Sequence, residues 1–141
     1  MPVFARSQDT TGVGCATILV SKMYPPELLD HFEHPRNAGA MESPDVSMQA
    51  ENPACGDVMK LMLRVSNGRI AEAKYQVRGC VASIACGSAL TEAIAGKSVP
   101  EAAMVRRESL VEKLGGLANE SMHASHLAID CLRLALKQLT N

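Results

Sequence analysis

The sequence predicts an α+β fold in which a small three-stranded antiparallel sheet has helices packed on one face. Three segments with strand-like residue patterns, 45–51, 58–65 and 70–77, lie together in the middle of the chain. The segments before and after them have helical patterns instead. A sheet with one apolar face must be covered, and helices grouped outside a run of strands are typical of an α+β arrangement.

Length and composition are those of one soluble globular domain. The chain of 141 residues is 47% hydrophobic and 21% charged, values typical neither of a disordered nor of a membrane-spanning protein. The 14 Lys and Arg residues are balanced by 15 Asp and Glu, so we expect no nucleic acid as a partner. No apolar run is long enough to cross a bilayer, so we expect no membrane either. Five cysteines, an odd number without the dense spacing of a secreted disulfide framework, favour a cytoplasmic location.

The domain is expected to comprise residues 23–141. Met23 directly precedes the first helical pattern, so residues 1–22 are interpreted as an N-terminal extension that is disordered or arises from an upstream start. Cys15, which lies in this extension, is then incidental to the function.

The first helix is expected to begin at Pro25 and Pro26 and to end by His34. Proline fits the first turn of a helix, where its missing N–H costs nothing, and Pro35 disfavours helical geometry in the residue before it. After a loop, residues 45–51 alternate apolar and polar side chains. They are therefore predicted to form the first strand.

The second and third strands are predicted to form a hairpin about Asn67-Gly68. A two-residue turn would place Leu63 opposite Glu72 and mix core and solvent positions on one face. A three-residue loop over 66–68 avoids this mixture, with Gly68 in the left-handed conformation. The predicted register therefore pairs Leu63 with Ala71, Leu61 with Ala73 and Met59 with Tyr75.

The remaining helices are delimited by residues that favour helix ends. Residues 82–95 are rich in small side chains, which allow close packing on the sheet, and a glycine follows as a C-terminal stop. Ser98 and Glu101 form a capping-box pattern that begins a short helix. Two further helices are expected over 107–114 and from Met122 to the C-terminus.

Candidate metal ligands lie in three loops or junctions between these elements. Cys55 and Asp57 flank Gly56, so a thiolate and a carboxylate can point into one space and bind a soft or borderline metal such as iron or zinc. Cys80 lies where the third strand meets the next helix, a position that favours the thiolate. His123 lies near the start of the last helix. The same cysteines are also compatible with simple burial in the core.

From Tyr24 onward the chain resembles the NifU/IscU-type iron–sulfur cluster assembly scaffolds. The resemblance is carried, in order, by residues 29–37 (LDHFEHPRN), 53–61 (PACGDVMKL), 79–80 (GC, followed by an Ala/Ser helix) and 123–125 (HAS). Three ligand loops matching in the right order are more specific than any single cysteine. The resemblance implies a SufE/NifU-like (IscU-like) fold.

The resemblance also implies a function and assigns roles to residues. Such scaffolds are not enzymes; they take sulfur from a cysteine desulfurase and iron from a donor, build a cluster and pass it to apo acceptor proteins. Cys55 and Cys80 would hold a labile, two-iron cluster, and Asp57 would be the carboxylate whose weaker hold permits release. His123 would be a neighbouring or alternative ligand.

Two departures from the family pattern concern the third ligand loop. Ala124 stands where relatives have a third cysteine directly after the histidine, and residues 117–121 lack the proline of the stretch that a dedicated chaperone recognises. A dedicated chaperone and de novo cluster synthesis are therefore not expected. Cys86, His126, a second subunit or a small thiol could replace the missing ligand.

The other cysteines and histidines are expected to have structural or surface roles rather than to bind a metal. Cys86 and Cys131 are expected to be buried hydrophobic side chains. His126, which shares a helix face with His123, is expected to be exposed or capping. His31 and His34 are expected to have surface and loop roles.

Two other functions are compatible with these residues. Two thiolates, a carboxylate and an imidazole also form a plausible four-coordinate zinc shell, so the chain could be a zinc-bound sulfur acceptor for a cysteine desulfurase. It could also be a decayed relative that keeps the fold and serves as a binding module of the assembly machinery. Metal content after reconstitution would distinguish the three functions.

Overall fold

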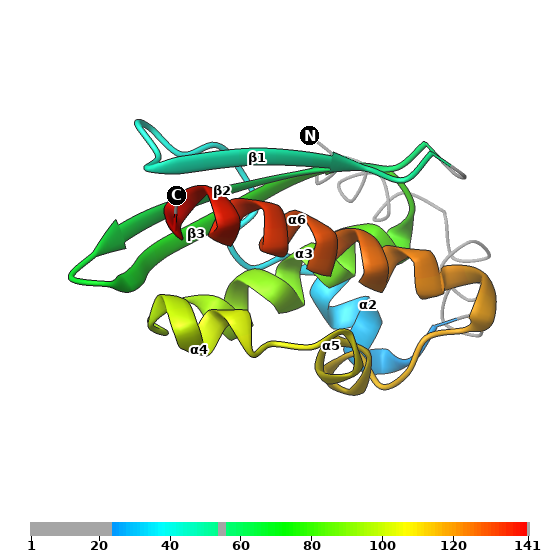
Figure 1. The fold of residues 1–141 in the computed structure, drawn as a ribbon. Coiled ribbons are helices and arrows are strands. Elements are labelled where there is room, and N and C mark those ends of the chain that lie inside the picture. Colours follow the sequence, from blue (N-terminus) through cyan, green and yellow to red (C-terminus); the bar gives the residue numbers. More distant parts are fainter. Residues whose placement is uncertain (1–23, 54–55, 141) are drawn as a thin grey trace.

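The structure, a computed structural model, describes residues 24–53 and 56–140. The predicted extension over 1–22, with Cys15, and the predicted ligand Cys55 lie outside the described residues. The secondary structure confirms the predicted order of elements (Figure 1). In chain order the elements are α2 (Pro26–Glu33), β1 (Val46–Glu51), β2 (Val58–Ser66), β3 (Arg69–Arg78), α3 (Val81–Ile94), α4 (Val99–Ala103), α5 (Arg107–Lys113), the 3₁₀ helix η2 (Asn119–Ser121) and α6 (Met122–Thr140).

The helix ends follow the local chemistry of the sequence. In α2, Pro26 is the first helical residue, and the helix ends at Glu33, just before the His34-Pro35 pair. At α4 the predicted capping box is present. The Glu101 N–H donates to Ser98 Oγ at 3.2 Å, and the Ser98 N–H donates to Glu101 Oε1 at 2.9 Å.

The sheet has the order β1-β2-β3, with both strand pairs antiparallel. The predicted hairpin register is wrong: Leu63 pairs with Ala73 and Leu61 with Tyr75. The turn consists of Asn67 and Gly68 alone, both left-handed with φ of 55° and 76°, and Ser66 pairs with Arg69. A register shift between Arg64 and Val65 leaves Ala71 as the extra residue of a β-bulge.

The bulge explains how a two-residue turn avoids the mixed face that argued against it. Without a bulge, this turn would place Leu63 opposite Glu72. The extra residue in β3 shifts every later pair by one, so that Glu72 pairs with Arg64 instead. Leu61 and Leu63 therefore still share one face with Tyr75 and Ala73.

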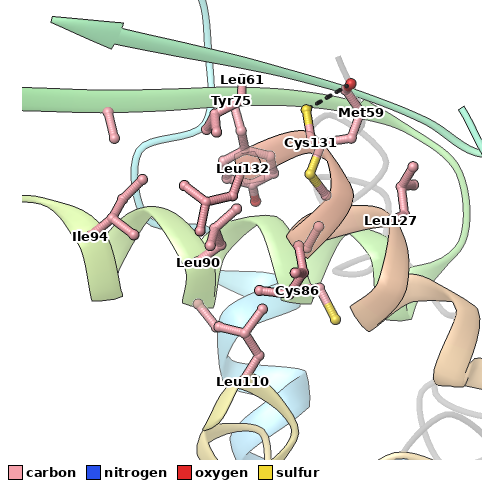
Figure 2. Packing of buried hydrophobic residues seen from close by; sticks show 14 of the residues in the cluster. Met59, Leu61, Tyr75, Cys86, Leu90, Ile94, Leu110, Leu127, Cys131 and Leu132 are labelled. Atoms are coloured by element: carbon pink, nitrogen blue, oxygen red, sulfur yellow. Dashed lines mark hydrogen bonds between the residues drawn. The ribbon is translucent and has the colours of Figure 1, made fainter. Parts of the chain in front are cut away.

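Helices α3 and α6 cover that apolar face, as Figure 1 shows, and α2, α4 and α5 lie on the side away from the strands. The α+β architecture with helices on one face of the sheet is therefore confirmed. Figure 2 shows the core between the layers, where Leu61 and Tyr75 from the sheet meet Leu90 of α3 and Leu132 of α6. No helix in the described part of the chain is long and apolar enough to cross a membrane.

Small residues bring α3 close to the sheet, as their abundance in the sequence predicted. A Cβ atom on Gly87 would lie 2.4 Å from the Tyr75 ring, so only glycine fits at this position. The Tyr75 hydroxyl donates to the Ile84 carbonyl at 2.8 Å. Because this contact places α3 directly on β3, it also fixes where the N-terminus of α3 lies relative to the strands.

His31 does not have the surface role that was expected for it. Its side chain is buried between α2 and α3, with Nδ1 2.7 Å from Ser88 Oγ. The Arg36 N–H donates to the same hydroxyl at 2.9 Å. His31 is therefore part of the contact that attaches α2 to α3, whereas His34 is exposed as expected.

Candidate metal centre

Three of the four predicted ligands converge at one end of the molecule. Asp57 comes from the β1–β2 loop, Cys80 from the residue before α3 and His123 from the first turn of α6. One ligand atom from each lies within 4.8 Å of the others. His123 Nε2 is 3.8 Å from Cys80 Sγ and 3.6 Å from Asp57 Oδ2. Cys55 belongs to the same loop as Asp57 but lies outside the described residues.

The β1–β2 loop is shaped by its own backbone. Glu51 pairs with Val58, so residues 52–57 must turn back within six positions. The Asn52 N–H donates to the Asp57 carbonyl at 2.8 Å, and the Gly56 N–H donates to the Asn52 carbonyl at 2.7 Å. Gly56 has a φ of +77°, a left-handed conformation that glycine adopts without steric cost. These constraints present Asp57 to the start of α3.

The Asp57 carboxylate is buried and is held by α3. Ser83 Oγ donates to Oδ2 at 2.6 Å, and the Cys80 N–H donates to the same oxygen at 3.4 Å. Burial raises the pKa of Asp57, but the hydrogen bonds from Ser83 and Cys80 and the nearby His123 outweigh burial and leave the pKa below its ordinary value. The carboxylate is therefore ionised and ready to bind a cation at neutral pH.

Gly79 allows the carboxylate to lie against the backbone. A Cβ atom at this position would be 2.5 Å from Asp57 Cγ, a distance that side chains do not tolerate. The glycine before Cys80 therefore has a steric role in the site. Its place in the sequence pattern Gly-Cys is explained by this close approach.

Cys80 is the half-buried residue that immediately precedes α3. Its Sγ lies 3.5 Å from Ser83 Oγ, one helical turn further on. The first N–H groups of α3 are oriented toward this end of the helix, where they favour a negative charge. A thiolate, an imidazole and a carboxylate within mutual reach fit zinc or iron, and three protein ligands leave a coordination position for another group.

The other candidate ligands do not join this cluster. Cys86 and Cys131 are fully buried, and burial raises the pKa of each thiol to about 12. Cys131 Sγ donates to the Met59 carbonyl at 3.4 Å inside the core (Figure 2). His126 is exposed and lines a separate groove of about 430 Å³ together with Arg106 and Arg133. The core roles expected for both cysteines are therefore confirmed.

Ser83 was not predicted from the sequence as a site residue. A serine three positions after Cys80 lies on the same face of a helix, and this spacing is the signal that could have identified it. The signal is weak because α3 contains a second serine, Ser88. Only the contact with Asp57, 26 positions earlier in the chain, distinguishes Ser83 from Ser88.

Known proteins resemble this chain in sequence over most of its length. Residues 23–141 match the family described as the NifU-like N terminal domain. The chain is 43% identical over 114 residues to the iron-sulfur cluster assembly scaffold protein IscU 1 of Archaeoglobus fulgidus, covering 81% of this chain and 74% of that protein. It is 38% identical over 117 residues to IscU of Haemophilus influenzae, covering 80% and 92% of the two chains. A Drosophila melanogaster relative, 38% identical over 118 residues, with 81% and 76% covered, is named an iron-sulfur cluster assembly enzyme.

Solved structures share the fold. A putative assembly scaffold of the SUF system from Fervidobacterium islandicum has a TM-score of 0.67 at 21% identity, covering 82% of this chain and 98% of that one. The N-terminal part of a NifU-like protein from Brucella abortus has a TM-score of 0.68 at 15% identity, covering 86% and 97%. Together with the sequence relatives, these findings confirm the resemblance inferred from the ligand loops. The chain therefore belongs to the NifU/IscU-type family of iron–sulfur cluster assembly scaffold proteins.

Proposed function

We propose that this protein carries a labile iron–sulfur cluster as its cargo and passes it to apo acceptor proteins. The observation that supports this function is the convergence of Asp57, Cys80 and His123 from three separate chain segments. The relatives named as assembly scaffolds support the same function. The protein acts as a scaffold that binds and releases, so the bond-making chemistry of sulfur mobilisation belongs to its partner.

Four protein ligands suffice for a two-iron cluster, in which each iron takes two ligands besides the bridging sulfides. Cys55 supplies a second thiolate from the loop that carries Asp57. His123 then takes the place of the cysteine that relatives have at the position of Ala124. Imidazole replaces thiolate on one iron of known two-iron centres, so this exchange is chemically reasonable. The two buried thiols, Cys86 and Cys131, are not needed.

Lability follows from the carboxylate. A hard oxygen ligand is a poor match for an iron–sulfur centre, so the bond between Asp57 and iron is the one that breaks most readily. The hydrogen bonds that lower the pKa of Asp57 also reduce its basicity and weaken it as a donor. Release to an acceptor would begin at this ligand.

The partners implied by this function are a cysteine desulfurase, an iron donor and apo iron–sulfur proteins. Cys80 and His123 are half-buried, so a partner can reach the site through these two side chains, whereas Asp57 is buried. Residues 117–121 contain no proline, and we assign no dedicated chaperone to this protein.

Anaerobic reconstitution with ferrous iron and sulfide, followed by visible absorption, tests the proposal. The wild type and a Cys131→Ala control should turn brown, whereas Cys55→Ala and Cys80→Ala should stay colourless. The holo-protein should be monomeric, with no small thiol attached, in native mass spectrometry. A dimer or a thiol adduct would contradict the internal ligand set.

Zinc and the absence of any metal are the informative alternatives. A colourless protein that retains one equivalent of zinc under these conditions would identify the protein as a zinc-bound sulfur acceptor. A protein that binds neither iron nor zinc would be a binding module of the assembly machinery. Either result would replace the carrier function proposed above.

A further inference from the structure

We propose that Ser83 is a positioning residue that fixes the Asp57 carboxylate beside Cys80 and His123. The inference rests on the proposed metal site and adds to it a residue that the ligand loops do not contain. Ser83 acts through Asp57 rather than through direct coordination. The argument depends on three features of this serine: its burial, its two contacts and the single hydrogen of its hydroxyl group.

Ser83 is completely buried on α3, one turn after Cys80. Its hydroxyl donates to Asp57 Oδ2 at 2.6 Å, the shortest contact described at the site. A hydrogen bond between a buried hydroxyl and a carboxylate is stronger than one between neutral groups. Losing it would leave a buried charge with fewer donors, so the contact has a large influence on where the carboxylate lies.

The second contact, 3.5 Å from Ser83 Oγ to Cys80 Sγ, settles the direction of the hydrogen bonds. A serine hydroxyl has one hydrogen to donate. Because that hydrogen points at Asp57, the Ser83 hydroxyl can only accept in the other contact, from Cys80 while its thiol is protonated. When a metal replaces the thiol proton, the Ser83 hydroxyl can continue to donate its hydrogen bond to Asp57. Metal binding at Cys80 therefore does not disturb the hold on the carboxylate.

The contacts described for the carboxylate all end on one oxygen. Ser83, the Cys80 N–H and His123 each approach Oδ2, at 2.6, 3.4 and 3.6 Å. Oδ2 is therefore the carboxylate oxygen that faces Cys80 and His123, and the hydrogen bond from Ser83 holds it on that side of the site. Ser83 thereby fixes where the carboxylate lies relative to the other two proposed ligands, Cys80 and His123.

Cobalt binding to the metal-free protein provides the test, because Co²⁺ reports its thiolate and imidazole ligands through visible absorption. Ser83→Ala should weaken Co²⁺ binding by about 10–100-fold, the usual effect of losing a hydrogen bond to a metal ligand. Ser88→Ala is the matched control. It removes another buried hydroxyl from α3, one that contacts His31 instead, and it should leave the Co²⁺ affinity within about twofold of the wild type.

A double-mutant cycle separates positioning from a general structural effect. In an Asp57→Ala background, titrated to millimolar Co²⁺, the further change Ser83→Ala should have almost no effect, because Ser83 acts through the missing carboxylate. An undiminished loss in that background would overturn the inference. So would wild-type affinity in the Ser83→Ala variant. Failure of the wild type itself to bind Co²⁺ would instead overturn the metal site and, with it, the role of Ser83.

Discussion

Asp57 and the buried cysteines differ in how their surroundings shift the pKa of the side chain. The Asp57 carboxylate is buried yet kept ionised by donors from α3, whereas the buried thiols Cys86 and Cys131 have their pKa raised to about 12 by desolvation. Hydrogen bonds and His123 thus outweigh burial at Asp57, in the proposed metal centre, whereas burial dominates at the two core thiols. This difference separates the proposed ligand Asp57 from the two packing cysteines.

Alkylation of the native protein should distinguish the half-buried Cys80 from the two buried cysteines. We expect iodoacetamide to modify Cys80, which is half-buried at the surface end of α3, and to leave Cys86 and Cys131 unmodified. Peptide mass spectrometry after brief treatment at neutral pH measures this for each cysteine. In urea all three should react. Modification of Cys86 in the folded state would show that α3 opens and that Cys86 is accessible to the site after all.

At the scale of elements, the helix boundaries were predictable because they depend on local signals. Pro26 at the start of α2 and the Ser98–Glu101 capping box are visible in sequence and are both present. The hairpin register and the burial of His31 were not predictable in this way. The register depends on a bulge at Ala71, which allows a two-residue turn to keep the apolar residues on one face. His31 is buried in a contact with Ser88, which lies 57 positions further along the chain.

The contact between α2 and α3 should make stability depend on pH. Burial, and then the nearby Arg36, lower the pKa of His31 below its usual 6.5. The folded state therefore binds a proton less readily than the unfolded state, so the contribution of His31 is complete above pH 6.5 and decreases as the pH falls through that value. We expect urea unfolding to show a smaller loss of stability between neutral and mildly acidic pH in His31→Gln than in the wild type.

Exposed His34 supplies the control for this prediction. His34→Gln should keep the pH dependence of the wild type, because the side chain is solvated in both states. If the free energy of unfolding changed equally with pH in the wild type and in His31→Gln, His31 would not be the source of the pH dependence. The comparison concerns only how the free energy of unfolding changes with pH. A loss of stability that is the same at every pH, from the missing Ser88 contact, does not affect it.

The hairpin turn gives a second prediction at this scale. Gly68 has a φ of +76°, so Gly68→Ala should lower the free energy of unfolding by about 1–2 kcal/mol, the cost of the left-handed conformation for a residue with a Cβ. Urea denaturation followed by circular dichroism measures the change. Ser66→Ala, at the exposed end of β2, should be nearly neutral. An equally large decrease in the free energy of unfolding of Ser66→Ala would mean that the effect does not come from the left-handed conformation of Gly68.

For the whole molecule, the proposed metal centre depends on how three distant segments are brought together. The sequence indicates that Asp57, Cys80 and His123 each lie at the end of an element, and the resemblance places them in the order of known ligand loops. Their convergence requires the packing of α3 and α6 on the same face of the sheet, which no local pattern specifies. The involvement of Ser83 requires that packing as well.

A metal that binds these three segments should stabilise the entire fold. Because the ligands are close together only in the native state, Zn²⁺ at about 100 times its dissociation constant should add about 2.7 kcal/mol, or roughly 8 °C in Tm for a domain of this size. Thermal unfolding with and without zinc measures the shift, and a chelator should reverse it. His123→Ala should greatly reduce the shift, whereas His126→Ala, on the same helix but exposed away from the cluster, should preserve it. Equal shifts in the two variants would mean that zinc binds elsewhere.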